Sequence, residues 1–598
     1  MSTDVDHAPP GLEATAGSLD EAAPPGGIGV PIEHAALAAS APSPFGRIWG
    51  QGLLVHLVVL GALLIGIAVL VGGPGAFATD EGSYELQLRA LQQGSWVWRS
   101  GTESLDPSGS HYPIAFSQQT DHGFVPLAKH PAWPLAAKLV SPITGIDHAY
   151  AVLGMAGVAV AAAMAWLLAA EHDPRWSRIA FWIAGLSPVV VTASLGWAHA
   201  PATGAAGVAT LGAVRLARRG LRAGPVALLV VGTTVGLLLR TEAVLVAGAL
   251  AVGLLVALRA AGKGWTLARA VAGAELVLVA IVTKAEGVWV HHIDGSGSSN
   301  FVARTAEAQS AGFVHDRLHA AWLSGLDPGF GGLRNITLVV LAVVAILALL
   351  VTLGRSVLVE AWQAGAGVLV LVLLLAMAMA PTEVVSGIVP AWPLAVVGIG
   401  AAGWTVLRRL PVELVWVTLY VGAILATQYV DGGAVQWGGR FYAPLIVPVA
   451  VLAAGGIVAL RRTAVAPAAA GILAALLLVP TFAGVTAVRS ANSSSHEVFE
   501  QVHADMRPGE VAVTAHQHLP RMMWRYTDLR WLVAADHGSD MAHLLRSLGS
   551  AKGPHAVALV VRGRDDALAK AALRQNPEWD EAGRDEVAGM HVVHLRRS

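Results

Sequence analysis

The feature that most constrains this chain is a series of apolar runs about 20 residues long, separated by short polar connections. A helix needs about 20 residues to cross the hydrocarbon core of a bilayer. Of the 598 residues, 55% are hydrophobic and only 13% are charged, against about 25% charged residues in soluble domains. The sequence therefore predicts an α-helical polytopic membrane protein with thirteen spans, at about residues 52–71, 149–170, 178–195, 198–217, 224–240, 242–259, 268–288, 336–354, 357–380, 389–407, 412–430, 442–460 and 465–487.

The basic residues divide the connections between these spans into two classes. If the N-terminus is cytoplasmic, every short inner loop carries Arg or Lys, and the short outer connections carry almost none, with Arg240 and Arg440 as exceptions. This is the asymmetry that the positive-inside rule requires. We therefore expect a multi-pass protein of the cell membrane with three long segments outside, at 73–147, 289–335 and 489–598.

The two ends of the chain differ in composition from the spans. Residues 1–45 are rich in Pro, Gly, Ala and acidic residues without apolar periodicity, which predicts a disordered cytoplasmic tail. Residues 46–488 form the transmembrane domain. In residues 489–598, short apolar segments at 510–515, 530–535, 555–561 and 590–595 alternate with helical stretches, which predicts a small extracytoplasmic α/β domain.

Composition also limits the partners and cofactors. The net charge of −1 indicates no nucleic-acid partner, and the absence of cysteine excludes disulfides and thiolate metal sites. The chain has no Walker or GxGxxG motif, so no nucleotide is assigned. Enrichment in Ala, Gly and Val is typical of a high-GC bacterial proteome.

Two adjacent carboxylates, Asp80 and Glu81, follow the first span directly. A helix starting here would place Glu81, Tyr84 and Glu85 on one face. Carboxylates close to hydrocarbon are costly unless they are solvated, paired or used. Either the pair caps the following helix, which the helix dipole favours, or it takes part in catalysis.

Further polar residues are expected on the same outer side. These are His130 in KHPAWP, Arg240 and Glu242 in LLLRTEAVL, Glu383 in PTEVVSG and Arg440 in QWGGRFYAP. Any one of them could simply extend its charged group to the interface. Together they indicate a site for an anionic group, since Arg holds phosphate oxygens in a planar fork.

With these motifs, the chain resembles the GT-C superfamily. Its members are integral-membrane glycosyltransferases that use polyprenyl-phosphate sugars, including protein mannosyltransferases, aminoarabinose transferases and actinobacterial arabinofuranosyltransferases. The resemblance covers roughly residues 50–490, and an external C-terminal domain fits it. It implies a GT-C-like fold that transfers a sugar from a polyprenyl-phosphate donor to an acceptor hydroxyl on the outer membrane face. The acceptor would be a glycan, glycolipid or protein, and the pathway one of cell-envelope assembly.

The resemblance also implies roles for individual residues. Asp80 would be the general base on the acceptor hydroxyl, with Glu81 beside it placing the acceptor or its charge. Arg440 and Arg240 would bind the donor phosphate. The remaining substrate contacts would come from Tyr84, His130, Trp133, Glu242, Glu383, Trp437 and Tyr442, with Trp133 and Trp437 as platforms for sugar stacking.

No metal ligands are assigned, although a divalent cation is compatible with the sequence. His291, His292 and Asp294, together with His315 and His319, could bind such an ion, and the pair His516 and His518 is a weaker candidate. The alternative is that these residues are solvated or hydrogen-bonded.

Two other functions remain open at this point. One is a transporter or lipid-linked-sugar flippase, although transporters usually carry ionisable residues near the bilayer midplane and repeated halves. The other is a non-catalytic scaffold for envelope assembly, in which Asp80 would be only a helix cap.

Overall fold

The computed structural model describes residues 52–71, 76–107, 111, 118–120, 123–126, 130–294, 313–327, 385–427, 437–460, 466–534, 538–550 and 553–598. The predicted tail at 1–45, the predicted spans at 336–354 and 357–380, and Glu383 lie outside these residues.

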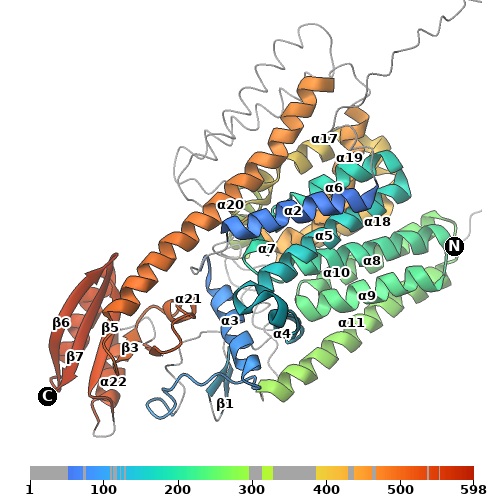
Figure 1. Ribbon diagram of the computed structural model, residues 1–598. Coiled ribbons are helices and arrows are strands. Elements are labelled where there is room, and N and C mark those ends of the chain that lie inside the picture. The colour runs from blue at the N-terminus through green and yellow to red at the C-terminus, as the bar shows by residue number, and fades with distance from the viewer. Residues whose placement is uncertain are drawn as a thin grey trace, which may run out of the picture. The chain divides into compact units, whose positions relative to one another are not determined.

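Long apolar helices dominate the part of the chain before residue 505. They are α2 (Leu53–Val71), α5 (Ile146–His172), α8 (His199–Arg219), α9 (Ala223–Leu239), α10 (Ala243–Ala260), α11 (Trp265–Asp294), α17 (Pro393–Leu407), α18 (Pro411–Thr427), α19 (Ile446–Leu460) and α20 (Ala466–Asp505) (Figure 1). Among the described residues, five helices are long and apolar enough to cross a membrane. The predicted count of about thirteen spans is therefore not confirmed.

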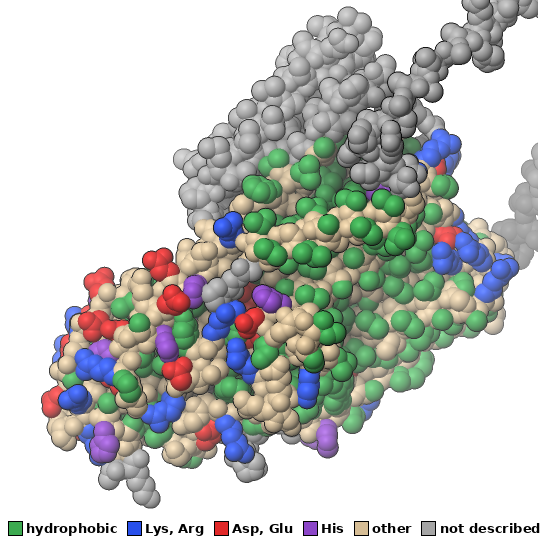
Figure 2. All heavy atoms as spheres, in the orientation of Figure 1, with side chains coloured by type: hydrophobic (Ala, Val, Ile, Leu, Met, Phe, Trp, Pro, Cys, Tyr) green, Lys and Arg blue, Asp and Glu red, His purple; other side chains and the backbone are tan. Residues whose placement is uncertain are grey.

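The outer surfaces of these helices are apolar. On α2, Leu54 is 73% exposed and Val69 75% exposed. Figure 2 shows hydrophobic side chains over the helical part, whereas charged side chains gather over the C-terminal sheet and around helix ends. An apolar surface of this kind is compatible with contact to lipid chains, whereas exposing it to water would be unfavourable.

Small residues allow the helices to approach closely. A Cβ atom on Gly212 of α8 would overlap the backbone of Leu229 in α9, and one on Gly232 of α9 would overlap Ala209 in α8. Packing of this kind drives helix association in membranes, where lipid tails are as apolar as the side chains.

The span predicted at 178–195 is interrupted, and the prediction of one continuous helix was wrong. It consists of α6 (Ser177–Gly185) and α7 (Val189–Ser194), because Pro188 has no N–H to donate and its ring clashes with the preceding turn. The carbonyl of Leu186 at the break accepts a hydrogen bond of 2.5 Å from the Thr481 hydroxyl of α20. This contact satisfies a backbone group that lipid could not.

The segment between α2 and α5 contains two helices and a hairpin. They are α3 (Thr79–Gln92), α4 (Ala132–Thr144), and the antiparallel strands β1 (Gln118–Thr120) and β2 (Gly123–Val125). Further short elements are α13 (Phe313–Ala321), the π-helical turn η2 (Trp322–Leu326), α16 (Ile388–Ala391), and the 3₁₀ helices η1 (Pro174–Trp176) and η3 (Arg440–Leu445).

The C-terminal part contains a five-stranded sheet in the order β4-β3-β5-β7-β6. Its strands are β3 (Val511–Thr514), β4 (Arg530–Val533), β5 (Ala556–Arg562), β6 (Trp579–Val587) and β7 (Met590–Arg597), with helices α21 (Leu519–Met522), α22 (Gly538–Leu548), η4 (Gly563–Asp565) and α23 (Asp566–Arg574). Strand β3 pairs in parallel with β4 and β5, whereas β7 is antiparallel to both β5 and β6. The apolar residues of β3 and β5 pack against α22 and α23.

Candidate active site

The N-terminus of α3 is capped by Glu81. Its Oε2 accepts the N–H of Phe77 at 3.0 Å, and its Oε1 accepts the N–H of Ala78, the N-cap residue, at 3.1 Å. These bonds satisfy two N–H groups ahead of the helix. Glu81 thus performs the capping role that was one interpretation of the acidic pair.

Asp80 has a different environment from its neighbour. It is the second residue of α3, and its Oδ2 accepts a hydrogen bond of 3.1 Å from Nη1 of Arg440 in η3. The Asp80 side chain is 36% exposed and that of Arg440 16%. The carboxylate is therefore accessible and engaged with a cation from a distant part of the chain.

Arg440 is held in place by the two preceding glycines. Gly438 and Gly439 have backbone φ angles of +65° and +58°, in a left-handed region that residues other than glycine rarely adopt. Their N–H groups donate to the carbonyls of Val385 and Ser386 at 2.8 and 2.6 Å. The backbone hydrogen bonds of the two glycines in the WGGR motif thus fix the position of the Arg440 backbone.

Aromatic rings also orient the Arg440 guanidinium. Its carbon lies 5.1 Å from the ring centroid of Trp197, which is fully buried, and 5.3 Å from that of Phe441. Stacking of Arg on aromatic faces stabilises the cation and limits its motion. The sequence did not point to Trp197 as a site residue, because tryptophans are common at span ends.

A second arginine–carboxylate pair lies near Tyr84. Arg240 donates from Nε and Nη2 to the two carboxylate oxygens of Glu242 at 3.0 and 2.7 Å. The charges of this pair, and those of Asp80 and Arg440, all act on the Tyr84 hydroxyl, whose pKa is raised by burial. Five of the predicted site residues therefore converge. Arg240 is already engaged in a bidentate pair, so a phosphate would have to displace Glu242 from it.

His130 links three elements. Its backbone φ is +49°, and the ring contacts Glu286 Oε1 of α11 at 2.9 Å through Nδ1 and Thr241 Oγ1 at 3.1 Å through Nε2. Thr241 lies between Arg240 and Glu242, so His130 adjoins the second pair. Glu286 was not predicted from the sequence, where it follows Lys284 near the end of a largely apolar run.

The three predicted aromatic contacts are buried. Trp133 and Trp437 are each 2% exposed, and Tyr442 is 5% exposed. Trp133 packs on Tyr150, with 5.4 Å between ring centroids, and Tyr442 Oη lies 3.5 Å from Ser324 Oγ. Their assignment as substrate contacts stays a prediction, and a sugar would reach these rings only after neighbouring side chains move.

Arg521 of α21 is a neighbour of the acidic pair that the sequence did not indicate. It is 1% exposed, its Nη2 contacts His518 Nδ1 at 2.8 Å, and Gly82 of α3 packs against its backbone carbonyl. Burial lowers the pKa of Arg521, and the Asp80 carboxylate opposes that effect. An arginine in a polar domain is unremarkable in sequence, so only the packing of α21 on α3 reveals it.

Burial changes the protonation of two glutamates of α3, Glu81 and Glu85. Burial, and then the charge of Asp80, raise the pKa of Glu81 to about 8, although the two backbone N–H bonds act in the opposite direction. Glu81 is accordingly neutral near pH 7. Glu85, one turn further along α3, likewise has its pKa raised to about 8, by burial and by Asp147.

The histidines considered as metal ligands do not gather in the described part of the chain. His291, His292 and Asp294 lie at the end of α11, and His315 and His319 lie on α13. The described residues contain one cluster of three ligand side chains, and none of these residues belongs to it. A divalent cation at the candidate site stays a prediction.

No protein-family model matches the sequence, and no curated protein matches it. Solved structures do match. ArnT from Cupriavidus metallidurans in the apo state has a TM-score of 0.50 at 11% identity, over 91% of this chain and 98% of ArnT. The oligosaccharyltransferase of Archaeoglobus fulgidus in the apo form has a TM-score of 0.51 at 12% identity, over 90% of this chain and 73% of that protein. ArnT bound to undecaprenyl phosphate matches with a TM-score of 0.48 at 12% identity, over 90% of this chain and 98% of that one.

Identities of 11% and 12% carry information about the fold and none about the role of any residue. Both proteins are GT-C glycosyltransferases. The similarity extends over nine-tenths of the chain, so it includes the helices and the C-terminal sheet. The resemblance first seen in the motifs is confirmed at this level: the chain has the fold of the GT-C glycosyltransferases.

Proposed function

We propose that this chain is a membrane glycosyltransferase that moves a sugar from a polyprenyl-phosphate donor to an acceptor hydroxyl on the outer face of the cell membrane. The observation that supports this most is the contact of 3.1 Å between Asp80 and Arg440. It joins an accessible carboxylate to an arginine that backbone and rings hold in place. In the same fold, ArnT has been solved with undecaprenyl phosphate, a lipid of the class proposed here as the leaving group.

The pair suggests an order of events. An incoming donor phosphate competes with Asp80 for the Arg440 fork, since arginine pairs with phosphate as well as with carboxylate. Asp80 is then released to accept a hydrogen bond from the acceptor hydroxyl. The hydroxyl oxygen attacks the anomeric carbon and its proton passes to Asp80, while the bond from that carbon to the phosphate oxygen breaks.

The electron pair of the broken bond goes to the phosphate oxygen, where Arg440 stabilises the developing charge. A lipid phosphate is already a good leaving group, so no general acid is required. One charged carboxylate therefore suffices, in contrast to the two of most glycosidases. A neutral Glu81 beside Asp80 fits this division, because it adds no negative charge where an anionic donor must bind.

The second pair supplies further contacts in this proposal. Arg240 and Glu242, with His130 and Tyr84 beside them, would bind the sugar or the far side of the phosphate. Trp133, Trp437 and Tyr442 would join them if the site opens, and Glu383 belongs to the same proposal from its sequence motif. Cell-envelope glycan or glycolipid assembly is the proposed pathway.

Binding of the donor can be tested separately from catalysis. The protein is purified in detergent, and polyprenyl-phosphate lipids retained by it are identified by native mass spectrometry. We expect Arg440→Ala to lose the lipid and Arg440→Lys to recover it in part, because Lys keeps the charge and loses the bidentate fork.

Arg489→Ala is the matched control, since Arg489 is an exposed arginine on α20 with no part in the proposed site. It should retain lipid at the wild-type level. Equal retention by Arg440→Ala and wild-type protein would contradict the assignment of Arg440 to the donor phosphate.

A further inference from the structure

The one cluster of three ligand-type side chains among the described residues lies in the C-terminal part and includes none of the residues of the proposed transfer site. Asp505 is the last residue of α20, Asp585 lies on β6 and His594 lies on β7. One nitrogen or oxygen atom from each lies within 4.8 Å of the others. The three residues come from separate elements, so folding alone brings them together.

His594 is buried and oriented. Its side chain is 1% exposed, and its Nδ1 lies 2.9 and 3.0 Å from the two carboxylate oxygens of Glu510, which is 3% exposed. Because a carboxylate only accepts, Nδ1 carries a proton in this contact, and in the neutral ring Nε2 then holds the lone pair. Metal-bound histidines are typically held in this way by a second carboxylate.

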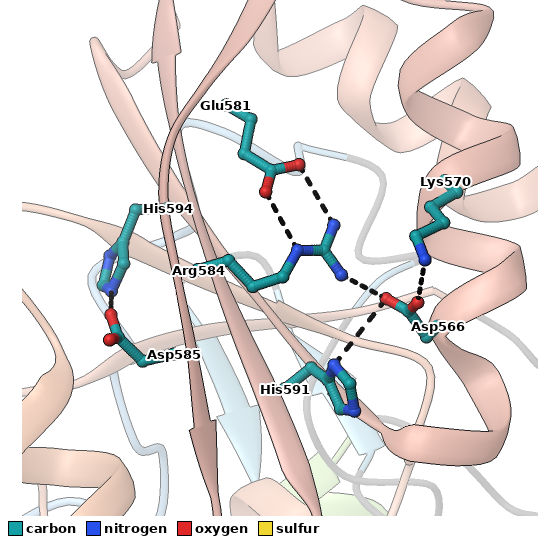
Figure 3. Close-up of polar contacts among 7 residues, drawn as sticks. All are labelled: Asp566, Lys570, Glu581, Arg584, Asp585, His591 and His594. Carbon is teal, nitrogen blue, oxygen red and sulfur yellow. Dashed lines mark hydrogen bonds and ion pairs between the residues drawn. The ribbon is translucent and has the colours of Figure 1, made fainter.

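The other ring nitrogen is directed at the two aspartates. Nε2 has no hydrogen-bond partner among the described residues, and it lies 3.5 Å from Asp505 Oδ2 and 3.6 Å from Asp585 Oδ2. Figure 3 shows the ring of His594 facing Asp585 across the β6–β7 hairpin. A buried nitrogen with two carboxylates just beyond bonding distance needs a physical reason.

The Lys and Arg ion pairs of α23 and β6 beside this cluster are shorter, whereas the imidazole of His591 lies 3.9 Å from Asp566. Asp566 contacts Lys570 at 2.6 Å and Arg584 at 2.5 Å, and Glu581 contacts Arg584 at 2.9 Å (Figure 3). A charged imidazolium would be expected to approach a carboxylate to about 2.8 Å. The ligand atoms of a tetrahedral zinc site, with bonds of about 2.0–2.1 Å, lie about 3.4 Å apart. Distances of 3.5 and 3.6 Å agree with the second geometry.

We propose that His594 Nε2, Asp505 and Asp585 bind a divalent transition-metal cation, Zn²⁺ by preference, with Glu510 orienting the histidine. Imidazole is a good ligand for zinc, whereas Mg²⁺ and Ca²⁺ prefer oxygen ligands alone. Asp585 is 52% exposed, so water can complete the coordination. The ion would tie the end of α20 to the β6–β7 hairpin, which makes its role structural.

The test uses the full-length protein in detergent, freed of its affinity tag, stripped with a chelator and dialysed. Zinc is then added, excess is removed by gel filtration, and bound metal is measured by mass spectrometry. We expect about one zinc per chain and a higher melting temperature with zinc. Asp585→Asn, on a half-exposed side chain whose replacement leaves the fold intact, should lose both effects.

Glu586→Gln is the matched control, because it removes the same charge from the next, exposed position of β6. It should bind zinc as the wild type does. Wild-type protein that retains no zinc would overturn the proposal. An Asp585→Asn variant that retains as much zinc as the control would also overturn it. So would an Asp585→Asn substitution that lowers the melting temperature equally with and without zinc, because loss of an ion pair between an imidazolium and Asp585 would have that effect.

Discussion

At the scale of single residues, the adjacent carboxyl groups of Asp80 and Glu81 make different contacts. Glu81 turns back onto the chain ahead of α3 and accepts two N–H bonds, whereas Asp80 points at Arg440. Glu81 therefore takes the capping role that the sequence left open, and a catalytic role for Asp80 stays a prediction. The capping box at the N-cap residue Ala78 is made by Glu81.

The raised pKa of Glu81 predicts a pH dependence. The group is protonated below about pH 8 and gains a negative charge above it, next to the place where an anionic donor would bind. We expect kcat/KM for sugar transfer to fall as the pH rises through about 8, since this parameter reports the free enzyme. Glu81→Gln, which cannot ionise, should lack this fall, and an unchanged alkaline limb in the variant would contradict the assignment.

The same shift has a consequence for stability. The folded-state pKa of about 8 lies above the unfolded value of 4.5, so protonation of Glu81 stabilises the folded chain. This contribution is complete below pH 4.5 and is lost as the pH rises to about 8. The Glu81→Gln variant also loses one of the two hydrogen bonds from backbone N–H groups, which lowers the free energy of unfolding by about 1 kcal/mol. The transfer rates of the variant and the wild type are therefore compared well below the melting temperature of the variant.

The sequence could supply Asp80 and Arg440 as site candidates, because charged residues at span ends are conspicuous. It could not supply their contact, since the two lie 360 positions apart. Nothing in the sequence marked Arg521 or Trp197 as a neighbour of the candidate site. One is an arginine in a polar domain, and the other is one of 19 tryptophans, many of them at span ends.

At the scale of elements, the pattern of apolar residues predicted the buried strands of the C-terminal sheet and missed its exposed edge strand. Strands β3, β4, β5 and β7 follow apolar segments and were expected where they occur. Strand β6 was not, because its sequence WDEAGRDEV is mostly charged. It lies at the edge of the sheet, where charged side chains face water and discourage pairing with other chains.

The contact between α3 and α21 is an element-scale feature that can be tested. A Cβ atom on Gly82 would collide with the carbonyl of Arg521, so we expect Gly82→Ala to destabilise the protein by about 1–3 kcal/mol through overpacking. Gly61→Ala in α2, where nothing lies within 4 Å of the added atom, should leave the melting temperature unchanged or raise it. Equal melting temperatures for the two variants would contradict the close packing.

At the scale of the whole molecule, hydropathy predicted a polytopic helical fold, and the described residues do not confirm its count of thirteen spans. The break at Pro188 divides one expected span, and α20 continues from the apolar segment as far as Asp505, through the boundary proposed at residue 488. Helix breaks and extensions depend on contacts such as that of Thr481 with Leu186, which hydropathy does not contain. The GT-C fold itself was accessible from motifs before the structure.

The topology proposed from the basic loops predicts that residues 73–147 and 489–598 lie on the same, non-cytoplasmic side. A periplasmic-type reporter fused after Ser598 should be active, and one that functions only in the cytoplasm should be silent. The packing of α21 against α3 requires both segments to share a side. Activity of the cytoplasmic reporter after Ser598 would invalidate the outward orientation of the C-terminal domain.

The measurement that tests the central claim most directly is sugar transfer by Asp80→Asn. Purified protein is incubated with polyprenyl-phosphate sugars extracted from native membranes, and released polyprenyl phosphate is quantified by mass spectrometry. An amide of the same shape cannot take the acceptor proton, so we expect turnover to fall by about 10²–10⁴-fold.

Donor binding by this variant should be kept or tightened, because Asn no longer competes for Arg440. Asp147→Asn, which neutralises a carboxylate that pairs with Arg89 and Arg525, serves as control and should turn over as the wild type does. A folded Asp80→Asn protein that binds donor and is inactive is the predicted result. Turnover by Asp80→Asn within about twofold of wild type would contradict the account, since a general base contributes far more than that.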